Sequence, residues 1–315
     1  MNAVGQLSVG ARYAEGRLAD LEVALQRPQV TRLYLGKPAA VVVETVPVLF
    51  SVCAQAQRRA AEAALAGAGD RILPPADPQP LWAEMLHEHL WRLLLDWPPA
   101  LGLPQATEAF AIWRGARGGA GLRAATDRVL EGTLLGVAAA AWAGVAQAHS
   151  LAARCLGVLG QGPACAEFDF PSLHPADWLP YWKNPTLAAP PAEGPSTVAA
   201  AYRERLGAVV QAARSLASGA PYPVAMAGGA GWGVGQTLTA RGVLTHGARL
   251  EAGRVVAYRV WAPTDRHFVD AAALAALVDG RRWPDEDAAR RGLEQAVLAL
   301  DPCLPHELKV SVSDA

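Results

Sequence analysis

The sequence has few cysteines, and those few lie far apart. Cys53, Cys155, Cys165 and Cys303 are the only ones in 315 residues, and no two of them form a CxxC pair. Disulfide-rich secreted domains place many cysteines in a short chain. The sequence therefore predicts no disulfide framework.

An excess of charge of one sign is also absent. The formal net charge is −1, with acidic and basic residues interspersed, so nothing attracts the chain to nucleic acid or to an anionic membrane. The first residues, MNAVGQLSVGARYAEG, contain no basic segment followed by an apolar run. We therefore expect no signal peptide, a cytoplasmic location, and neither nucleic acid nor a membrane as a partner.

One stretch without formal charge, residues 132–153, approaches the length of a bilayer span. It consists mainly of Ala and Gly, and it includes Gln147, His149 and Ser150. This composition favours a buried, closely packed helix, and a membrane span is the alternative.

Apolar residues are abundant, at 52% of the chain, and they follow periodic patterns. A chain of this length can bury about three quarters of its unfolded surface, in one large domain or two closely packed ones. The patterns predict a hairpin over residues 7–25, a second over 237–262, and a Pro-rich connection over 161–197. Helices are expected over residues 54–67, 79–97, 106–118, 122–160, 198–217 and 283–300.

Glycine is concentrated in AMAGGAGWGVGQ, residues 225–236. The spacing of these glycines does not match GxGxxG, no GK[ST] motif is present, and the segment leads into a strand rather than a helix. The segment is therefore predicted to be a flexible or close-approach loop and not a nucleotide site.

Glu84 and His87 form an ExxH pair on one face of a predicted helix. Such pairs hold di-iron centres in helical bundles, but only when a second pair lies on a comparable helix. No second pair is found, so a surface or packing role is expected.

The role of Cys53 and that of Cys303 are ambiguous when each residue is considered alone. Cys53 lies where an apolar run becomes a helix, and the positive end of a helix dipole favours loss of the thiol proton. Cys303 lies in LDPCLPHELK, close to the last residue. Each could be a buried structural thiol, or a thiolate ligand for a soft metal such as iron, nickel or copper(I).

Three separated stretches together resemble the large subunit of nickel–iron hydrogenases. Residues 33–57, LYLGKPAAVVVETVPVLFSVCAQAQ, are similar to a region in which a Gly-Arg/Lys-Pro turn precedes RxCGxCxxxH. Residues 299–309, ALDPCLPHELK, resemble the C-terminal DPCxxCxxH. Residues 239–264, TARGVLTHGARLEAGRVVAYRVWAPT, resemble the intervening stretch in which an APRG segment, a hairpin and a Pro-Ser/Thr pair line the iron cyanide pocket. The three occur in the same order as in the large subunit.

At the N-terminal motif the chain departs from the enzymes. Cys53 matches the second cysteine, a position that bridges nickel and iron, but Phe50 stands at the first cysteine. Val48 replaces the preceding Arg, and Gln57 replaces the following His. A phenyl ring cannot bind a metal, so one thiolate of the enzyme site is lost.

The C-terminal motif departs in the same way. Cys303 matches the first cysteine, a nickel ligand in the enzymes, whereas His306 stands at the second cysteine and Lys309 at the final His. With two of four thiolates missing, a four-thiolate nickel site cannot be assembled. The resemblance therefore implies neither hydrogen activation nor bound nickel.

The positions that surround the iron are better preserved. Ala240 replaces the Pro of APRG, but Arg241 is kept, Thr264 follows Pro263, and Asp301 precedes the final Pro-Cys. The resemblance implies that Arg241 donates to a cyanide nitrogen and that Thr264 donates to a second cyanide. It implies that Asp301 orients or tunes Cys303.

This pattern resembles the HupK/HoxV-type hydrogenase accessory proteins, which are similar to truncated large subunits with fewer cysteines. The resemblance implies an α+β fold, with a helical bundle and peripheral β-hairpins, and a single domain over residues 1–315. Within it, residues 1–160 would hold the hairpin and first helices, 161–197 the connection, and 198–315 the remaining elements.

The same resemblance implies a function that is not enzymatic. The chain would be a maturation scaffold that transiently holds an iron cyanide/carbonyl unit through Cys53, Cys303 and His306. Its partners would be the hydrogenase large-subunit precursor and the maturation proteins that assemble the iron unit. Cys155 and Cys165 match no motif of the family and are expected to be structural.

Two other functions remain open from the sequence. One is a metal-free chaperone that mimics the large subunit to bind hydrogenase subunits or maturation factors. The other is a diverged oxidoreductase that uses the remaining thiols, although no dinucleotide fingerprint supports it.

Overall fold

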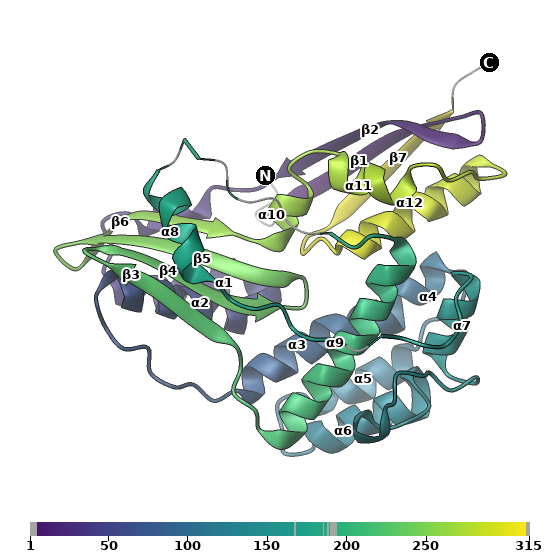
Figure 1. The fold of residues 1–315 in the computed structure, drawn as a ribbon, viewed down its shortest axis with the longest axis horizontal. Helices are drawn as coiled ribbons and strands as arrows, with labels where there is room; N and C mark the ends of the chain where they lie inside the picture. Colours follow the sequence, from purple (N-terminus) through teal and green to yellow (C-terminus); the bar gives the residue numbers. More distant parts are fainter. Residues whose placement is uncertain (1–4, 167, 185, 188, 190–193, 313–315) are drawn as a thin grey trace.

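The computed structural model describes residues 5–166, 168–184, 186–187, 189 and 194–312, and it combines two β-sheets with a group of helices (Figure 1). The first half of the chain contains β1 (Gln6–Ala14), β2 (Arg17–Gln26), η1 (Val30–Tyr34), α1 (Ala39–Leu49), η2 (Ser51–Cys53), α2 (Ala54–Ala68), α3 (Gln79–Trp91), η3 (Arg92–Asp96), α4 (Trp97–Ala100), α5 (Thr107–Ala116), α6 (Leu122–Val129), η4 (Leu130–Leu134), η5 (Ala139–Ala141) and α7 (Leu151–Val158). The second half contains α8 (Pro175–Lys183), α9 (Val198–Ser218), β3 (Val224–Gly229), β4 (Trp232–Thr239), β5 (Gly242–Glu251), β6 (Arg254–Trp261), α10 (Pro263–His267), α11 (Ala272–Val278), α12 (Glu286–Leu300) and β7 (His306–Val312).

The first sheet joins the two ends of the chain. Its strand order is β2-β1-β7, in which β1 and β2 form the predicted hairpin and β7 runs parallel to β1 with His306 opposite Leu7. Helices α11 and α12 lie beside this sheet (Figure 1). The hairpin prediction is confirmed, whereas the pairing of the C-terminal segment was not predicted.

The second sheet is antiparallel, with strand order β3-β4-β5-β6. Helix α2 packs along one face and α8 lies on the other (Figure 1). The predicted hairpin over residues 237–262 corresponds to β5 and β6, with a tight turn between Glu251 and Arg254. Helix α8 falls inside the segment that was predicted to be an irregular connection. The rest of that connection is described except for residues 167, 185, 188 and 190–193.

Glycines allow β4 to lie directly against the backbone of α2. A Cβ atom at Gly233 would lie 2.0 Å from the carbonyl oxygen of Ala64, and one at Gly235 would lie 2.3 Å from that of Ala60. Only a residue without a side chain fits at such distances. The predicted close approach is therefore confirmed, but the segment forms strands β3 and β4 and not a loop.

The prediction of one helix over residues 122–160 is wrong. The chain forms α6 and η4, then leaves helical geometry except for the short η5, and returns to an α-helix at α7. Gly136 and Gly144 have φ values of 77° and 79°, which interrupt a right-handed helix. The uncharged stretch of residues 132–153 is therefore largely irregular and partly exposed, rather than a buried helix.

The remaining helix predictions agree with the structure at α2, α5, α9 and α12. Trp97-Pro98-Pro99 does not end the helical segment as expected, because both prolines fall in the first turn of α4, where their missing N–H groups are tolerated.

The main hydrophobic core extends from Leu7 to Leu304, so residues from both ends of the chain contribute to it. The division of the chain into domains stays a prediction. In the described part of the chain, no single helix has the length and apolar character needed to cross a membrane. Helix α1 and the helical segment that follows it have that length and apolar character only when taken together, and the two are bent by 99° relative to each other.

Candidate metal centre

Cys53 is the residue that precedes α2, at its N-cap position. The carboxylate of Glu84 on α3 accepts the backbone N–H groups of Gln55 and Ala56, at 2.8 and 3.0 Å, and so caps the helix beside the thiol. The side-chain amide of Gln57 donates to Cys53 Sγ at 3.5 Å. The thiol thus accepts from Gln57 of the following helix, and Glu84 fixes the first turn of that helix.

Cys303 lies just beyond the end of α12. Asp301 ends this helix in the left-handed conformation, with a φ of 49°, and turns the chain toward the site. The backbone N–H of Cys303 donates to the hydroxyl oxygen of Thr264 at 3.2 Å. Arg27, which follows β2, donates from Nη2 to Cys303 Sγ at 2.9 Å.

Although 249 residues separate the two cysteines in the sequence, the fold brings Cys303 close enough for its charge to act on Cys53. The pKa of Cys53 is raised to about 12, chiefly by burial and also by the charges of Cys303 and Glu84, while Arg241 and Gln57 act in the opposite direction. Burial therefore opposes the loss of the thiol proton that the helix N-terminus was expected to favour.

Arg241 approaches both thiols from the inside of the protein, with a side chain that is 4% exposed. Its Nε donates to the carbonyl oxygen of Asp301 at 3.1 Å, and Nη2 donates to Glu88 at 2.8 Å. Burial alone would lower the pKa of Arg241, but Asp301, Glu88 and the two cysteines raise it. Its Nη1 is buried and has no hydrogen-bond partner among the described residues. A donor is therefore available for an acceptor that the chain itself does not supply.

The carboxylate of Asp301 lies at the centre of a buried ion network. Arg92 pairs with Oδ1 at 2.6 Å, Arg205 with Oδ2 at 2.8 Å, and Arg241 with Oδ1 at 3.5 Å. Burial would raise the pKa of Asp301, but the three guanidinium groups hold it far below its usual range. The side chain thus holds the three arginines, and no hydrogen bond joins it to the Cys303 thiol among the described residues.

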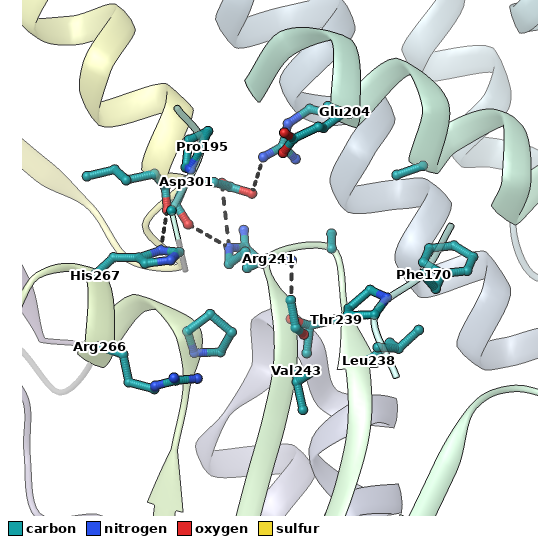
Figure 2. Close-up of a pocket in the computed structure, with 18 of the residues that line it drawn as sticks. Phe170, Pro195, Glu204, Leu238, Thr239, Arg241, Val243, Arg266, His267 and Asp301 are labelled. Carbon is teal, nitrogen blue, oxygen red and sulfur yellow. Dashed lines mark hydrogen bonds and ion pairs between the residues drawn. The ribbon is translucent and has the colours of Figure 1, made fainter. Parts of the chain in front are cut away.

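A cavity of about 860 Å³ is lined in part by Arg241 and Asp301. Figure 2 shows the Arg241 side chain directed toward Asp301, with Thr239 below the backbone of Arg241 and His267 beside the end of α12. Phe170 and Leu238 form an apolar part of the lining. The residues that line this cavity do not include Cys53, Thr264 or Cys303. Arg241 lines the cavity and also interacts with both cysteines, so it lies between the cavity and the thiol site.

The structure does not bring His306 to the two thiols. Its Nε2 lies 3.1 Å from a carboxylate oxygen of Glu294, and the side chain lines a separate pocket with Trp91 and Arg92. Throughout the described ranges, no group of three or more His, Cys, Asp or Glu side chains is arranged to hold a metal ion. The expected three-ligand set of Cys53, Cys303 and His306 is therefore not assembled in this structure.

Sequence reasoning missed several residues of the site. Glu84, Glu88 and Arg92 are four residues apart along one helical segment, which places them on one face, and all are largely buried. This i, i+4 spacing is the signal in the sequence that points to their shared face, whereas the Glu84–His87 pair alone does not. His87 instead stacks near Trp113, with ring centroids 6.0 Å apart, so the packing role is supported and a surface role is not. No local pattern distinguished Arg27 from other basic residues.

Comparison of the whole sequence with known proteins finds relatives that are aligned over nearly their full length. The chain is 33% identical to the hydrogenase expression/formation protein HupV of Azotobacter chroococcum mcd 1, over 97% of this chain and 98% of the relative. It is 32% identical to HupK of Azotobacter vinelandii, with the same coverage. No model of a known protein family matches the sequence.

Comparison of the fold finds hydrogenase large-subunit structures. The reduced, active form of the Ni-Fe-Se hydrogenase from Desulfomicrobium baculatum aligns with a TM-score of 0.57 and 12% identity, over 93% of this chain and 95% of that one. The oxidized Ni-Fe-Se hydrogenase of D. vulgaris Hildenborough aligns with a TM-score of 0.51 and 11% identity, over 92% and 94%. The predicted α+β fold of the hydrogenase large-subunit type is confirmed. Together with the full-length sequence similarity, this shows that the chain belongs to the HupK/HupV family of hydrogenase expression/formation proteins.

Proposed function

We propose that the protein is a non-catalytic maturation scaffold that transiently holds the iron cyanide/carbonyl unit of nickel–iron hydrogenase and delivers it to the large-subunit precursor. Cys53 and Cys303 would bind the iron, Arg241 and Thr264 would hold its diatomic ligands, and Asp301 would keep Arg241 in place. The iron unit is the cargo of this protein and not a resident cofactor.

One observation carries the proposal. Two thiols from opposite ends of the chain share a site with Arg241, whose Nη1 is buried without a partner in the described structure. A buried, unpaired guanidinium nitrogen is costly unless an acceptor binds there. A cyanide nitrogen on an iron held by the thiols is such an acceptor.

The small number of protein ligands also fits a cargo that brings its own. A bare transition-metal ion requires about four or more donor groups from the protein and water, and the described residues supply no cluster of three. An iron that already carries cyanide and carbonyl needs fewer. Two thiolates would hold it more weakly than a complete enzyme site, which suits transfer to another protein.

Infrared spectroscopy tests the proposal directly. The protein would be purified without oxygen from cells that express the genes for assembly of the iron unit, as wild type, Cys53→Ala and Cys303→Ala. We expect cyanide and carbonyl bands in the wild-type protein and their loss in both variants. Because both thiols must be deprotonated to bind iron, loading should also release protons.

Cys165→Ala is the matched control. Cys165 is a partly exposed free cysteine like Cys53 and Cys303, but it lies in the turn where its N–H donates to Gly144. This variant should keep the bands. A wild-type protein without iron and without cyanide bands would contradict the scaffold function.

A metal-free chaperone is the second candidate, and one observation favours it. Five exposed apolar side chains fall within the short segment that leads to Cys53. Val48 is 76% exposed, which is unusual for a residue of an apolar helix and typical of a protein contact surface. The five residues are Leu33, Leu35, Val48, Leu49 and Val52. Full maturation activity of Cys53→Ser in cells would support the chaperone, whereas loss of activity would support the scaffold.

A further inference from the structure

Arg27 reaches the thiol site from the end of the N-terminal hairpin. Its Nη2 donates to Cys303 Sγ at 2.9 Å, and its Nε lies 2.5 Å from the carboxylate of Asp265 on α10. The next residue toward the N-terminus, Thr264, accepts the backbone N–H of Cys303. Arg27 and α10 therefore hold Cys303 from two directions, one through its sulfur and one through its backbone.

The site is thus placed between two guanidinium groups. Arg241 lies on the inner side, with a side chain 4% exposed, and Arg27 lies on the more open side, with a side chain 25% exposed. Both interact electrostatically with Cys53 as well as with Cys303. Asp265 directs the Arg27 guanidinium through Nε, which leaves Nη2 facing the sulfur.

Two guanidinium groups affect different metal species in opposite ways. A bare divalent cation is repelled by a fixed positive charge near its ligands. Cyanide, in contrast, presents anionic nitrogen acceptors to which N–H groups donate charge-assisted hydrogen bonds. A thiolate that binds a metal retains lone pairs. The hydrogen bond from Arg27 to the Cys303 sulfur can therefore remain while that sulfur binds iron.

We propose that Arg27 is a specificity-determining residue, which favours an iron unit carrying cyanide over a bare divalent cation at Cys53 and Cys303. This inference rests on the proposed function and adds a selection step to it. A scaffold that excluded free zinc, cobalt or iron ions would remain available for its cargo in a cell that contains all of them.

Cobalt(II) is a suitable probe of a bare cation, because thiolate coordination gives it a charge-transfer absorption band. The full chain, purified without metal, would be titrated with Co²⁺ as wild type, Arg27→Gln and Arg27→Lys. Removal of one unit charge near a divalent ion should tighten Co²⁺ binding by roughly tenfold in Arg27→Gln, since Asp265 offsets part of the charge. Arg27→Lys keeps the charge and should stay within about threefold of wild type.

A control arginine separates this effect from a change in total charge. Arg32 is exposed in η1 and makes no side-chain contact with either sulfur in the described structure, so Arg32→Gln should leave the Co²⁺ affinity unchanged. Circular dichroism and the thermal midpoint would show that each variant is folded. In protein from cells that assemble the iron unit, Arg27→Gln should carry a several-fold weaker cyanide band than wild type.

The outcomes distinguish this inference from the function on which it rests. If Arg27→Gln binds Co²⁺ no more tightly than wild type, or if Arg27→Lys behaves like Arg27→Gln, the selection by charge is wrong. If Co²⁺ binding changes as expected but wild-type protein never shows cyanide bands, the scaffold function is overturned while the action of Arg27 on bare cations is supported.

Discussion

His246 and Gln57, on β5 and α2, form a buried hydrogen bond that connects the second sheet to the thiol site. His246 Nε2 lies 2.9 Å from Gln57 Oε1, and Nδ1 lies 2.7 Å from the hydroxyl of Tyr258. Because the amide oxygen accepts from His246, the amide nitrogen of Gln57 faces Cys53 Sγ. The amide of Gln57 thus contacts both the second sheet, through His246, and the Cys53 thiol.

This buried pair predicts a pH dependence of stability. Burial lowers the pKa of His246 to about 3, so the folded protein keeps the imidazole neutral. The unfolded chain binds a proton below about pH 6.5. The stability contributed by neutral His246 is therefore complete above pH 6.5 and is lost as the pH falls toward 3, by about 2 kcal/mol at pH 5.

Urea denaturation of wild type and His246→Gln between pH 5 and pH 7.5 measures this effect. Gln cannot be protonated, so the difference in unfolding free energy between the two proteins should shrink by about 2 kcal/mol from pH 7.5 to pH 5. The other buried histidines are common to both proteins and cancel. A difference that is constant with pH would contradict the prediction, and the exposed His149→Gln is the control.

Asp301→Asn tests the buried ion network. Asn tolerates the left-handed backbone at this position, so the change isolates the loss of charge. Three arginines would lose their shared carboxylate, and we expect a loss of about 3–5 kcal/mol of unfolding free energy. Asp96→Asn is the control, since Asp96 pairs with Arg92 at a more exposed place and should cost at most about 1 kcal/mol. Equal costs for the two variants would argue against a central role of Asp301.

The close contact between β4 and α2 can be tested with a single methyl group. Gly235→Ala would place a Cβ atom 2.3 Å from backbone atoms of Ala60 and Ala64, which cannot move as a side chain can. We expect at least about 2 kcal/mol of destabilisation. Since Cys53 immediately precedes α2, we also expect weaker thiolate binding of Co²⁺. Gly115→Ala is the control. Nothing lies within 4 Å of the added atom in α5, and Ala should stabilise that helix by about 0.5–1 kcal/mol.

Local patterns predicted the elements that local physics decides. The alternation around Glu15-Gly16 predicted the first hairpin, and the acidic first turn after Pro284 predicted α12, whose N-cap Asp285 accepts the N–H of Ala288. The glycines of residues 225–236 correctly predicted a close approach of two backbone segments. They did not predict that the segment itself forms strands, because the helix that β4 contacts, α2, lies far away in the sequence.

Non-local contacts explain what the sequence did not predict. β7 forms only because the C-terminal segment meets β1 from the other end of the chain, and this pairing turns His306 toward Glu294. The resemblance to hydrogenase large subunits indicated Cys53 and Cys303, since it carries information on distant pairs. Arg27 lies outside the motifs that carry the resemblance, and only the folded structure places it on Cys303.

The hydroxyl of Thr264 gives the last prediction. It is fully buried and accepts the N–H of Cys303 at 3.2 Å, so Thr264→Val keeps the shape and leaves that N–H without its acceptor. We expect a loss of about 1–3 kcal/mol of unfolding free energy and faster exchange of the Cys303 amide hydrogen. Thr264→Ser keeps the acceptor, removes one methyl group at a cost of about 1 kcal/mol, and should keep the slow exchange. If the Cys303 amide hydrogen exchanges equally fast in Thr264→Val and Thr264→Ser, the hydrogen bond to Thr264 does not position Cys303. The position of the Cys303 sulfur would then depend on Arg27 alone.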